Sequence, residues 1–114
     1  MMYTLVHAGG EAGAGEFAWW LKRLGDTRTR ANVLLHLERM KLGLFGDWKS
    51  LGGGLREMRL HFGKGYRIYF ALEAETLVLL LAAGNKQTQK RDMQGARSRL
   101  QAWRREHGGA GSVT

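Results

Sequence analysis

The apolar residues of this chain follow two different periods, and each change of period marks the boundary of an element. From Leu55 to Phe70 apolar and polar residues alternate, as in a half-buried strand, and Gly63-Lys64-Gly65 interrupts the alternation with residues suited to a tight turn. Residues 76–84 are apolar without alternation, which is typical of a strand covered on both faces. Tyr3–His7 predicts one further short strand, and a flexible glycine-rich connector is expected at residues 9–15.

A helical period appears in three other segments and predicts three helices. The first covers Glu16–Leu24. The second begins after Asp26, a suitable N-cap, and ends near Leu42, before a glycine suited to the C-terminal turn. The third begins at Thr88. The residues expected to face inward are Phe17, Trp20, Leu21 and Leu24 in the first helix, Ala31, Leu34, Leu35 and Met40 in the second, and Met93, Ala96, Leu100 and Trp103 in the third.

The predicted order of elements is β-α-α-β-β-β-α, an α+β fold in which a mainly antiparallel four-stranded sheet packs against helices. Residues 44–54 are rich in glycine and lack apolar alternation, so we expect an irregular loop there. No internal repeat or second domain is indicated. We therefore expect a single domain over residues 1–107, followed by a flexible C-terminal tail over residues 108–114.

The predicted hairpin would gather polar side chains on one side of the sheet. Glu57, Arg59 and His61 alternate with apolar residues in its first arm, and Arg67 and Tyr69 do so in its second. A carboxylate, two guanidinium groups, an imidazole and a phenol on one face suit a phosphodiester better than they suit a core. Arg67 is the hardest of these to explain structurally, because a guanidinium in mid-strand needs a partner.

Composition narrows the possible functions. The 114 residues include 18 Lys and Arg against 10 Asp and Glu, giving a net charge of +8, and a domain this basic usually meets nucleic acid or an acidic protein. The chain has no cysteine, which excludes disulfides and thiolate zinc sites, and its four histidines lack metal-ligand spacing. We therefore expect no metal and no cofactor. The longest apolar run, Leu77–Ala83, is too short to cross a membrane, and the first residues do not resemble a secretory signal, so a cytoplasmic protein is expected.

Three motifs of the chain resemble the RelE/ParE superfamily of bacterial toxins, and in particular its HigB-like, phage-derived "addiction module killer" branch. They are FAWWLKRLGD at Phe17–Asp26, LGLFGDWKSLGGGLREMRLHFGKGYRIYF at Leu42–Phe70 and LLLAAGNKQTQKRDM at Leu79–Met93, in the order and spacing of the family. The resemblance implies a RelE-like fold and a cognate antitoxin, expected to be a helix-turn-helix protein. It also implies cleavage of mRNA in the ribosomal A site.

The resemblance also suggests roles for individual residues. Arg67 matches the phosphate-stabilising arginine of the family, and Lys86 matches a basic residue that stabilises the phosphate or protonates the leaving group. Glu57 and Arg59 fall near positions where RelE-type members carry lysines, while Lys49 falls near a carboxylate base of some members.

From this resemblance and the polar residues of the hairpin, we expect the protein to be the toxin of a type II toxin–antitoxin system. We expect it to be a metal-independent endoribonuclease that acts on mRNA at the ribosome and inhibits translation. Such cleavage needs a base for the 2′ proton, cations around the phosphorane and an acid for the 5′ oxygen. Glu57 is a candidate base, Lys86 or His61 a candidate acid, and Tyr69 a surface on which a base could stack. The expected catalytic residues are Glu57, Arg59, Arg67 and Lys86, and the expected RNA-binding residues are Lys49, His61, Lys64, Tyr69, Lys90 and Arg91.

Two alternatives stay open. One is a ParE-like toxin that poisons DNA gyrase without nuclease activity, and the other is a basic RNA-binding module without catalysis. Several nuclease members use a late tyrosine or histidine, but the last helix of this chain offers Gln89 and Asp92 in that region. This absence favours the alternatives, whereas the clustered polar residues of the hairpin favour the nuclease.

Overall fold

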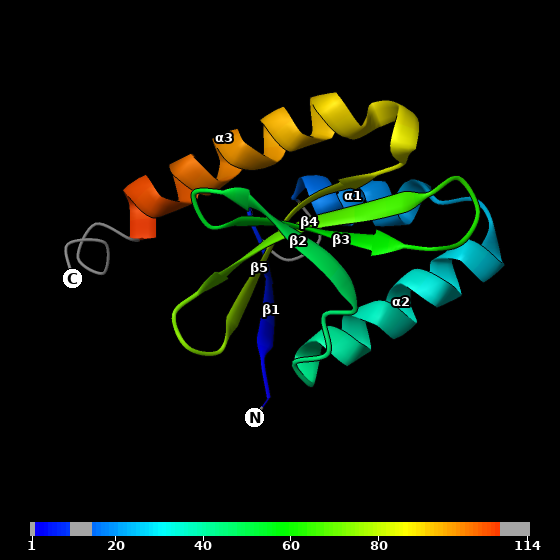
Figure 1. Ribbon diagram of the computed structural model, residues 1–114, viewed down its shortest axis with the longest axis horizontal. Coiled ribbons are helices and arrows are strands. Elements are labelled where there is room, and N and C mark those ends of the chain that lie inside the picture. The colour runs from blue at the N-terminus through cyan, green and yellow to red at the C-terminus, as the bar shows by residue number, and fades with distance from the viewer. Residues whose placement is uncertain (1, 10–14, 108–114) are drawn as a thin grey trace.

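Five strands form one mixed sheet with helices on both of its faces (Figure 1). The structure, a computed structural model, describes residues 2–9 and 15–107. Its elements are β1 (Thr4–His7), α1 (Glu16–Arg23), α2 (Thr27–Lys41), β2 (Asp47–Gly52), β3 (Leu55–Leu60), β4 (Tyr66–Glu73), β5 (Leu77–Gly84), the short 3-10 helix η1 (Lys86–Thr88) and α3 (Gln89–His107). The strand order is β1-β5-β4-β3-β2, in which β1 runs parallel to β5 and the other pairs are antiparallel.

The predicted α+β class is confirmed, and the predicted sheet is corrected. The segment expected to be a loop contains β2, so the sheet has five strands instead of four. β2 lies at the edge, pairs only with β3 and has most of its residues exposed, which explains why its sequence lacks the apolar alternation of a half-buried strand. The predicted tail at 108–114, and residues 10–14 of the predicted connector, lie outside the described residues.

Two apolar cores flank the sheet. On one face, side chains of α1 and α2 pack against alternate residues of β3, β4 and β5. On the other face, Ala96 and Leu100 of α3 pack against the intervening residues of β4 and β5. The first core includes Phe17, Val33, Leu37, Met40, Met58, Leu60, Ile68, Phe70, Val78 and Leu80. The second includes Leu55, Tyr69, Ala71, Leu79, Leu81 and Ala82. β5 is therefore covered on both faces, as its unbroken apolar sequence predicts.

The buried side of α2 differs from the predicted one. The helix buries Thr29, Val33, Leu37 and Met40, and of the four residues expected to face inward only Met40 does so. Apolar residues occur on two sides of this helix, so its period alone does not identify the inner side. Asp26 acts as the predicted N-cap, because its carboxylate accepts hydrogen bonds from the backbone nitrogen and hydroxyl of Thr29 at 3.3 and 2.6 Å.

Candidate functional site

Strand pairing brings the polar residues of β2, β3 and β4 into two adjacent rows. Lys49 pairs with Glu57 and Glu57 with Tyr69, which makes one row, and Arg59 joins Asp47 to Arg67 in the next. Directly paired residues project to the same face of a sheet. The predicted polar face of the hairpin is therefore present, and β2 extends it by one strand.

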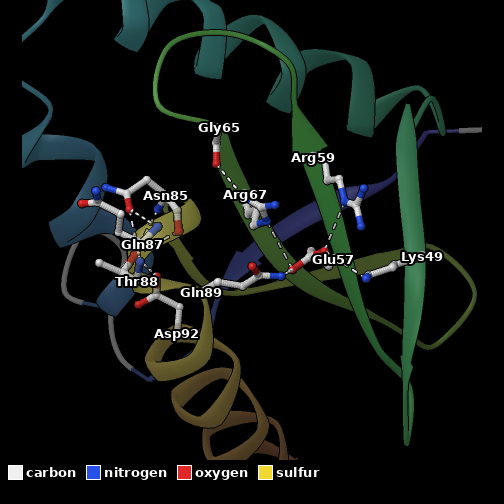
Figure 2. Close-up of polar contacts among 10 residues, drawn as sticks. All are labelled: Lys49, Glu57, Arg59, Gly65, Arg67, Asn85, Gln87, Thr88, Gln89 and Asp92. Atoms are coloured by element: carbon white, nitrogen blue, oxygen red, sulfur yellow. Dashed lines mark hydrogen bonds and ion pairs between the residues drawn. The ribbon is translucent and has the colours of Figure 1, made fainter.

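Glu57 is the centre of this face (Figure 2). Its side chain is 0% exposed and lies among three cations: Oε1 is 3.5 Å from Arg59 Nε and 3.9 Å from Lys49 Nζ, while Oε2 is 3.6 Å from Arg67 Nε. Gln89, the first residue of α3, donates a hydrogen bond of 3.1 Å from Nε2 to Oε2. The carboxylate thus joins the sheet to the start of α3 and holds three cationic side chains around itself. We name Lys49, Glu57, Arg59, Arg67 and Gln89 the Glu57 cluster.

Hydrogen bonding within the Glu57 cluster is incomplete. Among the described residues, Glu57 Oε1, Arg67 Nε and the Tyr69 hydroxyl are buried without a hydrogen-bond partner. Arg67 Nη1 does donate to the carbonyl of Gly65 at 2.7 Å, which turns the guanidinium along β4. Buried polar groups are usually satisfied, so unused donors and acceptors at one place are a feature of sites that receive a ligand.

Cation exposure increases from the centre of the cluster toward its rim. The side chain of Arg67 is 12% exposed, that of Arg59 40% and that of Lys49 49%. A phosphate at the rim can therefore reach Arg59 and Lys49 directly, with Arg67 beneath them. His61 also lies at the rim, where its Nε2 is 2.6 Å from Asp47 Oδ2.

Tyr69 does not present the exposed ring that we expected for base stacking. It is fully buried under α3, in the second core. Burial, followed by the negative charge of Glu57, raises the pKa of the Tyr69 phenol above its ordinary value, so the hydroxyl stays protonated at alkaline pH where an exposed tyrosine ionises. Sequence alternation gave the correct face for Tyr69 but did not show that a helix covers this part of it.

Lys86 and Arg67 both lie close to Gly65. A Cβ atom at Gly65 would be 3.5 Å from Arg67 Nη1 and 3.7 Å from Lys86 Cβ, and the φ of +74° favours glycine there. The backbone nitrogen of Lys86 donates to the carbonyl of Lys64 at 3.5 Å, which joins the hairpin tip to η1. Lys64 and Lys86 are both exposed at this junction. The structure therefore brings the two predicted phosphate ligands, Arg67 and Lys86, to neighbouring positions.

The start of α3 is built around a buried carboxylate. Thr88 donates a hydrogen bond of 2.5 Å to Asp92 Oδ2, and Asn85 caps η1 through Gln87 and Thr88. A Cβ atom at Gly84 would collide with Asp92, so only glycine fits at the end of β5. Asp92 is thus occupied in a structural role, and Gln89 is the residue of this helix that reaches the Glu57 cluster.

The basic side of α3 is partly structural. Arg97 donates to the carbonyls of Leu51 and Gly52, and Arg104 donates to both carboxylate oxygens of Glu73 at 2.9 and 3.1 Å. Hydrogen bonding to Glu73 raises the pKa of Arg104. Lys90 and Arg91, the two predicted RNA-binding residues of this helix, are exposed near its start. Arg91 Nη2 lies 3.4 Å from Asp92 Oδ1.

A cleft of about 1080 Å³ lies next to the Glu57 cluster, between α1, the hairpin tip and the start of α3. Its lining includes two aromatic side chains and charges of both signs. These residues are Trp20, Arg23, Lys64, Tyr66, Arg91 and Asp92. Glu57 and Arg67 do not line this cleft, so the cleft and the Glu57 cluster are separate features.

The comparison with known families now identifies the class of protein. Residues 20–101 match the model of the family described as "Phage derived protein Gp49-like (DUF891)". The chain belongs to this family. An uncharacterised protein of Haemophilus influenzae is 38% identical over 81 residues, which are 71% of this chain and 82% of that protein. No solved structure matches the chain.

The Gp49-like family is part of the RelE and addiction-module killer toxins, so the resemblance of the motifs is confirmed at that level. A toxin family implies an antitoxin partner. The matched residues of this Gp49-like protein include the whole Glu57 cluster, together with Lys86 and Arg91, and exclude β1.

The described residues hold neither a metal-binding cluster nor a membrane-spanning helix. Within residues 2–9 and 15–107, no three His, Cys, Asp or Glu side chains are grouped closely enough to hold a metal ion. None of the helices in the described part of the chain has the length and apolar character needed to span a membrane.

Proposed function

We propose that this Gp49-like protein is the toxin of a type II toxin–antitoxin pair and that it cleaves mRNA at the ribosome without a metal ion. The observation that carries the proposal is the Glu57 cluster, in which one buried carboxylate holds three cations at the edge of an open sheet face. Fixed cations stabilise the charge that develops on a phosphorane, and such preorganised electrostatics often contribute most to catalysis. The ribosome as the place of action comes from the family resemblance.

Each cation has a distinct part in the proposal. Arg59 and Lys49 bind the phosphate that arrives at the rim, and Arg67 contacts the same phosphate from beneath. Guanidinium groups suit this task because they donate to two oxygens at once. Lys86, which like Arg67 lies close to Gly65, contacts the phosphate or the leaving 5′ oxygen.

The proposed reaction forms a bond between the 2′ oxygen and phosphorus and breaks the bond between phosphorus and the 5′ oxygen. The 2′ proton passes to a base, and the 5′ oxygen receives a proton from an acid. His61 and Lys86 are the exposed side chains beside the cations, so they are the candidates for proton exchange with RNA. Glu57 is fully buried beneath the arginines, and we assign it as a positioning residue in place of the expected base.

The ParE-like alternative is supported by one observation. Gln89 occupies the start of α3 that faces Glu57, and an amide supplies neither a phenol nor an imidazole for proton transfer. A gyrase poison would need the cationic face only as a contact surface. The two functions predict different damage in the cell.

Induction of the chain without its antitoxin separates them. The nuclease proposal predicts new 5′ ends within translated mRNAs, mapped by primer extension soon after induction, with intact chromosomal DNA. The same ends should be absent when translation initiation is blocked. Intact mRNAs together with DNA breaks at gyrase sites would contradict the nuclease proposal, and intact mRNA and DNA with unimpaired growth would contradict the toxin assignment.

A further inference from the structure

The cleft between α1, the hairpin tip and the start of α3 has no part in the proposed reaction. Its volume of about 1080 Å³ is comparable with that of the larger pockets that enclose small organic molecules, roughly 1,000 Å³. It lies at the end of the sheet where the hairpin tip meets the end of β5, and helices from both faces of the sheet form its sides. The cleft can therefore admit a ligand, and segments that are distant in the sequence would contact it.

Two aromatic side chains of the cleft are held in place by the first core. Trp20 packs against Phe17 with 5.6 Å between ring centroids, and Tyr66 packs against Phe62 at the same distance. The rings of Trp20 and Tyr66 are 6.1 Å apart at an interplanar angle of 65°, so they are not stacked on each other. Both side chains are only partly buried, and both line the cleft. The parts of the rings that the core leaves exposed can therefore contact a planar ligand.

The three acidic side chains that line the cleft already have partners within the protein. Asp92 accepts a hydrogen bond from the hydroxyl of Thr88. Asp26 is the N-cap of α2, and Glu16 Oε1 lies 4.0 Å from Arg99 Nη1. These carboxylates are therefore occupied in internal contacts.

Two of the cations that line the cleft are unpaired. Arg23 of α1 and Lys64 of the hairpin tip are exposed, and neither makes an ion pair within residues 2–9 and 15–107. Arg91 adds a third exposed cation at the start of α3. Aromatic rings beside cations bind single-stranded nucleic acid, because the bases stack on the rings and the cations contact the phosphates. The lining of the cleft therefore suits a nucleotide.

The hairpin tip connects the cleft to the Glu57 cluster. Tyr66 and Arg67 are consecutive in β4, so their side chains project to opposite sides of the strand. Tyr66 packs against the first core, whereas Arg67 contacts Glu57 and donates to the carbonyl of Gly65. In Figure 2, Asn85 of the cleft and the Glu57 carboxylate lie on opposite sides of Arg67. A strand of RNA with a phosphate at Arg67 would therefore reach the cleft with its next nucleotide.

We propose that the cleft binds one base of the RNA, next to the nucleotide whose phosphate contacts Arg67. The base stacks on Trp20 and Tyr66, and the phosphate of the same nucleotide contacts Arg23 and Lys64. This inference rests on the proposed function, from which it takes RNA as the ligand and Arg67 as the neighbouring phosphate site. The cleft then gives cleavage a modest preference for a base that stacks strongly beside the cleaved bond.

Two oligomers of equal charge separate base binding from phosphate binding. One is a short oligoadenylate with 2′-O-methyl sugars, which cannot undergo the proposed reaction because its 2′ oxygens carry no proton. The other is an abasic oligomer of the same length. The affinity of the full chain for each oligomer is measured by fluorescence anisotropy at one salt concentration, since phosphate contacts depend on salt.

The ratio of the two affinities is the decisive quantity. The wild type should bind the oligoadenylate more tightly than the abasic oligomer by roughly fivefold or more, as expected for one stacked base. Trp20→Leu and Tyr66→Leu should each lower this ratio, whereas a purely structural loss would weaken both oligomers equally. The matched control is Trp19→Leu, which alters a residue of α1 that is 58% exposed and does not line the cleft. This control should leave the ratio unchanged.

A second variant tests the cleft at exposed positions, where folding is not at risk. Arg23→Gln with Lys64→Gln should weaken the binding of both oligomers and reduce its dependence on salt, because cationic contacts to phosphate are lost. Adenosine 5′-monophosphate should compete only weakly with the oligoadenylate, because it cannot contact the cleft and Arg67 together.

Several results would overturn this inference. They are no binding of the oligoadenylate, equal affinity of the wild type for the two oligomers, a ratio unchanged in Trp20→Leu and Tyr66→Leu, an equal fall in Trp19→Leu, and unchanged binding by the variant of Arg23 and Lys64. Binding of adenosine 5′-monophosphate as tight as that of the oligoadenylate would also overturn it, because the cleft would then be a site for a free nucleotide. Failure of the proposed function is recognised separately. If induction leaves mRNA intact while the ratio behaves as expected, the nuclease proposal fails and the base-binding cleft stands.

Discussion

The two faces of the sheet use the same strands for different purposes. Met58 and Ile68 point into the first core, where they pack against apolar side chains of α1 and α2. Their neighbours Glu57 and Arg67 point to the opposite face, which α3 covers only in part. One face therefore supplies stability and the other supplies a site. Because both arise from the same paired strands, the rigidity of the core fixes the positions of the charges.

Coverage by α3 decides which part of the second face becomes a site. Arg104 binds Glu73 of β4, and Arg97 binds carbonyls of β2, so the helix is held across one end of the sheet. Ala71, Leu79 and Leu81 lie in the apolar core beneath it. Arg59 and Lys49 lie beyond this core and keep contact with solvent. The following substitutions test this division between the two faces.

The largest effect on stability is expected on the apolar face. Phe70→Ala should lower the free energy of unfolding by about 3–5 kcal/mol, because Phe70 is fully buried and stacks on Phe45 at 5.4 Å between ring centroids. Denaturant unfolding measures the change. Phe62→Ala, at the partly exposed edge of the same core, is the control and should cost less. An equal loss at both positions would show that the depth of burial within this core does not set the cost of removing a side chain.

An intermediate effect is expected at the centre of the polar face. Glu57→Gln should lower the free energy of unfolding by roughly 1–3 kcal/mol, because it leaves the nearly buried Arg67 without its carboxylate. Glu38→Gln, which breaks an exposed ion pair with Lys41, is the matched control and should cost under about 1 kcal/mol. If Glu57→Gln is as stable as its control, the carboxylate does not hold the cations in place.

The smallest effect is expected at the Tyr69 hydroxyl. Tyr69→Phe should change the free energy of unfolding by less than about 1 kcal/mol at pH 8, because the hydroxyl has no hydrogen-bond partner among the described residues. Above pH 10 the variant should become the more stable of the two. The phenol ionises there in the unfolded chain, while burial and Glu57 keep it protonated in the folded chain, so the wild type loses stability as the pH rises.

Denaturant unfolding of both proteins at pH 8 and pH 11 makes this comparison. Parallel losses of stability with pH would contradict the assigned environment of Tyr69. A loss of toxicity in Tyr69→Phe at neutral pH would instead show that the hydroxyl takes part in function.

The apolar patterns along the chain predicted most of the helices and strands. They failed where contacts between distant parts of the chain determine which residues are buried. Alternation in the hairpin predicted its glycine turn and the polar face with Glu57 and Arg67, because strand geometry fixes side-chain direction locally. β2 was missed because an exposed edge strand needs no apolar period.

Other features of the site depend on residues far apart in the sequence. The contact between Gln89 and Glu57 joins positions 32 residues apart, and no period or motif signals it. The inner side of α2 was misassigned because Leu34 and Leu35 are apolar although they are exposed, while the polar Thr29 is buried. The burial of Tyr69 depends on where α3 crosses the sheet, which its own apolar stripe does not specify.

The most direct test of the account measures activity and stability in one variant. Arg67→Ala should lower the rate at which mapped mRNA ends appear by ~10²–10³, a loss typical of one transition-state contact. Its free energy of unfolding should fall by no more than roughly 1–3 kcal/mol, as for Glu57→Gln, because Arg59, Lys49 and Gln89 still contact Glu57. Arg105→Ala, on the exposed end of α3, should leave both quantities unchanged. Full toxicity of Arg67→Ala at normal expression would contradict the proposed site, and unfolding of the variant would show that the arginine is structural.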